Sequence, residues 1–180
     1  MQYSIHPPTP FLLRHRDKLL PEWSCSIGSV LVMLQHSGCS LVKRTDTTEA
    51  RKNQLRQNFL ALADKIAACL HGSGHWADVF DPKTGLPIYS KPGILELDDV
   101  AVVCACLGYD TVQVEGCSVI VHPTWGTAVY PSVVVASADP ERVQRVVNSL
   151  MVGGWVENIS LRRERSEYHH SFKGCGSLIQ

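Results

Sequence analysis

The sequence lacks an excess of charge, a long hydrophobic run and any Cys-x-x-Cys motif. Seventeen basic residues balance seventeen acidic ones, so the formal net charge is zero. Nucleic-acid-binding proteins usually carry a basic excess, and the composition therefore argues against nucleic acid as a partner. No apolar run reaches the ~20 residues that a membrane-spanning helix needs, so we expect no membrane partner either.

The first twenty residues lack the order of a secretory signal, in which a basic segment precedes an apolar one. Arg14, Arg16 and Lys18 among leucines resemble a transit peptide faintly, but Asp17 and three nearby prolines favour a short helix of the folded domain. We therefore expect a cytoplasmic protein, and the sequence leaves a mitochondrial pool open.

The seven cysteines are odd in number and scattered through apolar segments. This distribution is typical of reduced thiols in the cytosol rather than of a disulfide framework. The absence of Cys-x-x-Cys argues against a zinc ribbon or a thioredoxin-like dithiol. Cys104 and Cys106 form the closest pair, which we interpret as two small buried hydrophobic side chains.

The 180 residues, 44% of them hydrophobic, predict one domain over 1–152 and a loosely attached tail over 153–180. The predicted helices and strands are helices over 11–20, 47–71 and 139–150, and strands over 27–36, 110–115, 117–122 and 127–136. Residues 98–107 fit either a helix or a strand, and Gly108 favours a helix end. Because the later strands cluster, we predict an α+β fold with a mainly antiparallel sheet flanked by helices.

The predicted helix over 47–71 is the clearest element. Asp46 and Glu49 resemble a capping box at its start, and Gly72 and Gly74 favour its end. The apolar stripe that we expect to face the core consists of Leu55, Phe59, Leu62, Ile66 and Cys69 or Leu70.

Residues 76–81 and 86–89 flank a Pro/Gly turn and predict a β-hairpin. The residue types of His75, Asp78 and Asp81 suit a metal cluster, but strand alternation turns Asp78 away from the other two. We instead expect hydrogen-bonding, turn-forming roles, with Asp81 capping its own turn. Trp76 is expected to lie in the core or at an interface.

Cys117 is the candidate for chemistry. It starts a predicted strand, where a thiol near the sheet rim can be reached, and Gly116 before it lets a large flat ligand or partner approach the backbone. A thiolate is a soft ligand that suits a soft metal. The alternative is a buried structural cysteine. His122 could activate the thiol, but alternation places the two side chains on opposite faces.

Two blocks carry a resemblance to a known family. They are Gly-His-Trp-Ala-Asp-Val-Phe-Asp-Pro-Lys-Thr-Gly at 74–85 and Gly-Cys-Ser-Val-Ile-Val-His-Pro-Thr-Trp-Gly-Thr at 116–127. From about Leu12 to Leu150 the chain resembles the C-terminal domain of the methylmalonic aciduria and homocystinuria type D family, the cblD proteins. Members of that family often carry a second cysteine where this chain has Ser118.

The resemblance implies a nitroreductase-like scaffold without flavin and a protein that is not an enzyme. It implies an adaptor of intracellular cobalamin (vitamin B12) trafficking, which binds the cobalamin-processing protein cblC and routes cofactor to methionine synthase and methylmalonyl-CoA mutase. The family's cobalt-binding cysteine matches Cys117, and cobalamin would be bound only through the partner complex. The residues predicted to be structural or at the interface are Trp76, Asp78, Asp81, Gly116, His122 and Trp125.

Two other functions remain open from the sequence. One is a flavin-dependent, nitroreductase-like oxidoreductase, although the chain has no Arg/Ser-rich cluster for the flavin phosphate. The other is a plain protein-interaction module with an inert Cys117. A colourless purified protein would exclude the first, and mapping of thiol reactivity would separate the second from the adaptor.

Overall fold

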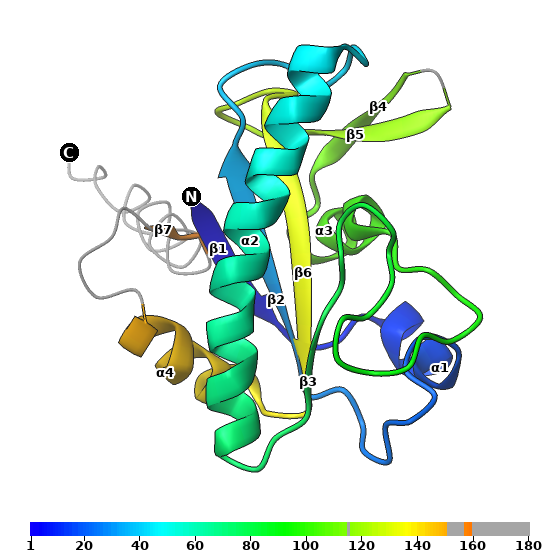
Figure 1. Ribbon diagram of the computed structural model, residues 1–180, viewed down its shortest axis with the longest axis vertical. Coiled ribbons are helices and arrows are strands. Elements are labelled where there is room, and N and C mark those ends of the chain that lie inside the picture. Colours follow the sequence, from blue (N-terminus) through cyan, green and yellow to red (C-terminus); the bar gives the residue numbers. More distant parts are fainter. Residues whose placement is uncertain (115, 151–156, 160–180) are drawn as a thin grey trace, which may run out of the picture.

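A five-stranded sheet forms the centre of the computed structural model, which describes residues 1–114, 116–150 and 157–159. The sheet has the order β3-β6-β2-β1-β7 (Figure 1). Its strands are β1 (Gln2–His6), β2 (Ser29–His36), β3 (Ala77–Val79), β6 (Val129–Ala136) and β7 (Glu157–Asn158). Neighbouring strands are antiparallel except for the parallel pair β1–β7. The predicted α+β fold with a mainly antiparallel sheet is confirmed.

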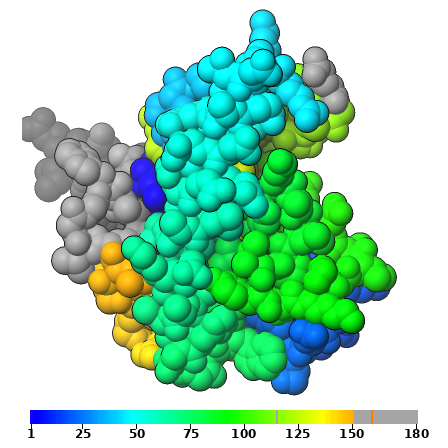
Figure 2. Space-filling model, viewed as in Figure 1, coloured from blue at the N-terminus to red at the C-terminus, as the bar shows by residue number. Residues whose placement is uncertain are grey.

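Helices cover both faces of this sheet. They are α1 (Pro10–Leu19), α2 (Asp46–Gly72), α3 (Asp99–Leu107) and α4 (Pro140–Leu150). Val30, Val32 and Leu34 of β2 pack in the core that includes α1 and α3. Leu31 and Met33 of the same strand pack with α2 and α4. Because both faces are covered, β2 is a continuous apolar run rather than an alternating one. Figure 2 shows α2 crossing one face, with the green segment that follows it packed alongside.

The start of α2 differs from the predicted Asp46–Glu49 capping box. Thr45 Oγ1 accepts a hydrogen bond from the Thr48 N–H at 3.2 Å, and Thr48 Oγ1 accepts one from the Thr45 N–H at 2.9 Å. The helix therefore begins one residue earlier, with threonines satisfying its free N–H groups. Asp46 and Glu49 lie in the first turn, where their negative charge suits the helix dipole.

The apolar face of α2 lies against the sheet, largely as its periodicity predicts. Its buried residues are Thr48, Leu55, Phe59, Ala63, Ile66, Ala67 and Leu70. Leu62 is only partly buried and Cys69 is exposed. Ala63 and Ala67 face the sheet instead, because the helix has 3.6 residues per turn. Their small side chains allow α2 to approach the strands closely.

The segment over 98–107 is a helix. The Asp98 side chain caps α3 by accepting from the Ala101 N–H at 3.0 Å. Gly108 ends it with a φ of 68°, in the left-handed region that favours glycine. These two end signals decide the structure of a sequence whose valines would equally suit a strand.

The predicted hairpin over 76–89 is wrong in its second half. β3 pairs with β6, and among the described residues only the Phe80–Pro87 bridge joins it to the segment that follows. Two backbone hydrogen bonds accompany this bridge, from the Asp81 N–H to the Leu86 carbonyl at 2.9 Å and from the Ile88 N–H to the Val79 carbonyl at 3.0 Å. A buried carboxylate, described below, holds the rest of the segment in place of a strand ladder.

A separate two-stranded ribbon, β4 (Asp110–Val114) and β5 (Cys117–Val121), extends beside the upper end of the main sheet (Figure 1). Both strands were predicted. Ile120 is 1% exposed and joins the core shared by α1 and α3, so it anchors the ribbon to the domain.

The predicted tail over 153–180 lies outside the described residues except at 157–159, where β7 pairs with β1. Among the residues that are described, no helix is both long and apolar enough to cross a membrane.

Candidate functional site

Cys117 is exposed at the first position of β5, opposite Val114. Gly116 before it has a φ of 82°, and a Cβ added there would meet nothing within 4 Å. A side chain at this position would be strained by the backbone rather than blocked by neighbours. The position next to the thiol is therefore uncrowded, and the approach of a large flat ligand or partner there stays a prediction.

His122 lies at the far end of β5 and is buried, so it is a structural anchor rather than a base for Cys117. Its Nδ1 accepts from the N–H groups of Thr124 and Trp125, both at 3.1 Å. This assigns the ring proton to Nε2, which lies 2.8 Å from Gln2 Oε1 and donates to it. The Trp125 ring stacks on the imidazole at 4.2 Å. Together these contacts tie the base of the ribbon to β1.

Asp78 is fully buried and holds the loop that follows β3. Its Oδ1 accepts from the N–H groups of Val79 and Ile88 at 2.9 Å and of Tyr89 at 3.1 Å. Its Oδ2 accepts from the Ser90 N–H at 2.8 Å. The predicted hydrogen-bonding role is confirmed, and both oxygens face backbone donors.

Asp81 forms a two-point ion pair with Arg56 of α2. Arg56 Nε donates to Asp81 Oδ1 at 2.5 Å and Nη2 donates to Oδ2 at 2.6 Å. Oδ1 also accepts from the Lys83 N–H at 3.0 Å, which confirms the predicted cap of its own turn. The hydrogen bond from Arg56 holds the pKa of Asp81 below its ordinary value. No sequence motif marks Arg56, because its partner lies 25 residues away along the chain.

Trp76 is 43% exposed, which excludes the core as its position, and the expected place at an interface stays a prediction. Its N–H donates to Ser137 Oγ at 2.9 Å, and β3 begins only at the next residue. The ring is tilted against that of Trp23 at 6.0 Å between centroids. Trp76 thus lies at the rim of the core.

The residues His75, Asp78 and Asp81 do not assemble into a metal site. Both carboxylates are directed to other partners, and within the described ranges no three His, Cys, Asp or Glu side chains form a group that could hold a metal ion.

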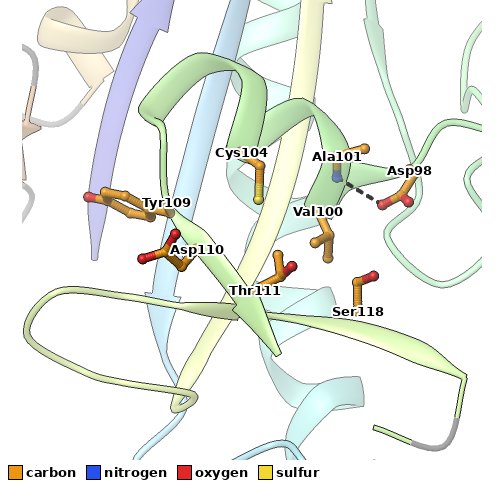
Figure 3. A pocket seen from close by; sticks show the side chains of 8 residues that line it. All are labelled: Asp98, Val100, Ala101, Cys104, Tyr109, Asp110, Thr111 and Ser118. Atoms are coloured by element: carbon orange, nitrogen blue, oxygen red, sulfur yellow. Dashed lines mark hydrogen bonds between the residues drawn. The ribbon is translucent and has the colours of Figure 1, made fainter. Parts of the chain in front are cut away.

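A cavity of about 340 Å³ lies behind the ribbon, between β4–β5 and α3. Figure 3 shows Thr111 and Ser118 pointing from the ribbon towards α3, and Cys104 pointing from α3 into the same space. Cys117 is not among the lining residues, because alternation along β5 turns it to the other face of the ribbon.

The two thiols of α3, Cys104 and Cys106, are poorly suited to act as a nucleophile or a metal ligand. Burial, together with the carboxylates of Asp98 and Asp110, raises the pKa of Cys104. Burial raises the pKa of Cys106 to about 11. Both therefore remain neutral thiols at neutral pH, which agrees with their interpretation as small hydrophobic groups, although both are only partly buried rather than buried.

Asp99, at the start of α3, is a buried carboxyl whose Oδ1 has no hydrogen-bond partner. Burial and the neighbouring carboxylates of Asp98 and Asp81 raise its pKa well above the ordinary value. The folded state therefore binds this proton more tightly than the unfolded chain does.

We expect Asp99→Asn to stabilise the protein by about 1–2 kcal/mol at pH 8 and by little at pH 4. Wild-type stability falls as pH rises above the unfolded pKa near 4, whereas asparagine carries no charge at any pH. Thermal unfolding at both pH values measures the difference, with exposed Asp110→Asn as the control. A variant no more stable than wild type at pH 8 would contradict this assignment.

The fold and the site together define an α+β domain that presents a cysteine thiol to solvent from a β-ribbon. The family model described as "Methylmalonic aciduria and homocystinuria type D protein" matches residues 4–148, and the chain belongs to this family. The resemblance seen in the sequence is confirmed.

Several curated proteins named "Cobalamin trafficking protein CblD" are similar to this chain. Those of Gallus gallus and Homo sapiens are 27% and 28% identical over 136 residues, and that of Rattus norvegicus is 29% identical over 132 residues. The alignments cover 72–73% of this chain and 44–45% of the relatives. The chain thus spans less than half the length of these curated relatives.

Proposed function

We propose that this protein is a non-enzymatic adaptor of intracellular cobalamin trafficking. In this role Cys117 supplies a thiolate to the cobalt of cobalamin held by a cblC-type partner. Family membership and the names of the curated relatives support the trafficking role. The observation that carries the cobalt role is the exposed thiol of Cys117 beside a glycine with open space around it.

The chemistry requires a thiol that a metal centre at the middle of a flat macrocycle can reach. A thiolate is a soft ligand, and binding to cobalt releases its proton to solvent. Cys104 and Cys106 are poorly suited, because their raised pKa values keep them protonated. Cys117 is exposed at the first position of β5, which leaves its thiol accessible from solvent. Coordination alone would hold the cofactor during transfer without any turnover.

The finer parts of the proposal come from the family resemblance. They are a nitroreductase-like scaffold without flavin, and delivery of cofactor towards methionine synthase and methylmalonyl-CoA mutase. The proposed cytoplasmic location comes from the scattered, odd-numbered cysteines of the sequence, and a mitochondrial pool stays open.

The test is the visible spectrum of cblC-bound cob(II)alamin during titration with this protein. We expect wild type to shift the spectrum and Cys117→Ser to leave it unchanged, because a hydroxyl is a poor ligand for a soft metal. Cys39→Ser is the matched control, since Cys39 is also exposed but lies in the loop before α2. Circular dichroism of each variant verifies folding. An equal shift with Cys117→Ser, or no shift with wild type, would refute the cobalt role.

A further inference from the structure

One face of the β4–β5 ribbon carries four valines, the Cys117 thiol and, opposite Val121 at its base, the exposed carboxylate of Asp110. The register pairs Val112 with Val119 and Val114 with Cys117, and directly paired residues of antiparallel strands share a face. Val121 follows on the same face by alternation. We call these five residues, Val112, Val114, Cys117, Val119 and Val121, the valine face.

The opposite face of the ribbon is turned towards the protein. Gln113 Nε2 donates to Ser118 Oγ at 2.6 Å, which places both side chains on this face. Figure 3 shows Thr111 and Ser118 directed towards α3. Ile120, on the same face, is buried in the core. The ribbon therefore turns Ser118 and one apolar anchor, Ile120, towards the protein, while Thr111 and Gln113 on the same face stay exposed.

The valine face is left uncovered by the described part of the chain. Val112 is 38% exposed, and Val114, Val119 and Val121 are partly exposed. None of the four valines belongs to a hydrophobic cluster formed by the described residues. A half-buried hairpin usually shows the reverse arrangement, with apolar residues inside and polar residues outside. Contiguous exposed apolar side chains of this kind mark an interaction surface.

We propose that the valine face is the platform on which the corrin ring of partner-bound cobalamin lies when Cys117 reaches the cobalt. This inference rests on the proposed function. The position of the thiol on the valine face selects this occupant, because an axial ligand must approach the cobalt from one side of the ring. The macrocycle must then lie across the strands that carry the thiol.

The neighbours of Cys117 fit such a ring on both sides. Side chains directly opposite each other lie about 5 Å apart, and diagonal neighbours about 7–8 Å apart, so a wide ring bound at the thiol must cover Val114 and extend over Val112. Val119, two residues along the same strand, lies under the same ring. On the other side Gly116 has no side chain and open space around it. The methyl-bearing face of a corrin is apolar, and contact with valines removes apolar surface of both from water.

The double variant Val114→Thr/Val119→Thr tests the platform, because threonine keeps the branched shape but adds a hydroxyl. In the spectral titration with cblC-bound cob(II)alamin we expect its Kd to rise about tenfold, since less apolar surface is buried. The spectrum at saturation should match wild type, because Cys117 is still present. Thr111→Val, on the inward face, is the matched control and should leave Kd unchanged.

The outcomes separate the two proposals. The platform would be refuted if the double variant had the wild-type Kd, or if Thr111→Val weakened binding equally. The cobalt role would still stand if the spectral shift depended on Cys117. No shift with wild type would overturn both. Sedimentation of the protein alone tests whether a second copy of this chain, rather than the corrin ring, covers the valine face. A dimer that the double variant abolishes would mean that another copy of this chain covers the valine face, and the platform would be refuted.

Discussion

Replacing Asp78 by alanine is expected to lower the free energy of unfolding by about 4 kcal/mol, because four backbone N–H groups lose their acceptor together. Each buried donor left without a partner costs about 1–3 kcal/mol. The total is below the simple sum, since the Ile88 N–H also donates to the Val79 carbonyl at 3.0 Å. Urea denaturation followed by circular dichroism measures the loss.

Two variants show whether the loss comes from these particular bonds. Asp78→Asn keeps Oδ1 for three of the donors and replaces the acceptor of the Ser90 N–H, so we expect a loss of about 1–2 kcal/mol. Asp139→Ala removes an exposed carboxylate that accepts from the Arg142 N–H at the start of α4, and should cost about 1 kcal/mol. An Asp78→Ala protein within 1 kcal/mol of wild type would contradict the structural role.

Asp78 also shows where prediction from the sequence fails. Periodicity was sufficient for most helices and strands, because apolar spacing reports which side of an element is buried. It was insufficient after β3, where the apolar residues on either side of a Pro/Gly turn suggest a hairpin. Beyond the Phe80–Pro87 bridge, a single buried carboxylate binds the backbone N–H groups there in place of a second strand, and no local pattern distinguishes it from a surface aspartate. The same limit hid Arg56, whose role depends on the packing of α2 against β3.

The ribbon shows a second limit. Alternation over β4 and β5 separates the valines from Thr111, Ser118 and Ile120, and it correctly separates Cys117 from His122. It does not say which face meets solvent. That choice depends on α3, which packs against the polar face and Ile120. A sequence with valines on one face would ordinarily be assigned an inward valine face, so the partial exposure of this face became visible only in the structure.

Removal of the Arg56 side chain is expected to cost about 3–5 kcal/mol at pH 7, because the Asp81 carboxylate is only 6% exposed and would remain charged without its partner. The hydrogen bond from Arg56 lowers the pKa of Asp81, so the contribution is present at neutral pH and is lost as pH falls through that lowered value. The difference between wild type and Arg56→Ala should therefore shrink at pH 3. Urea denaturation at the two pH values measures it.

Arg56→Lys and the double variant Arg56→Ala/Asp81→Asn identify the cause of this loss. Lysine keeps the positive charge but cannot make two parallel hydrogen bonds to the carboxylate, so its stability should fall between wild type and Arg56→Ala. Removing the Asp81 charge from the Arg56→Ala protein should recover part of the loss at pH 7, because no unpaired carboxylate is then buried. If the loss were equal at both pH values and unaffected by Asp81→Asn, the packing of the arginine stem would be its source. The ion pair would then contribute little to joining α2 and the turn after β3.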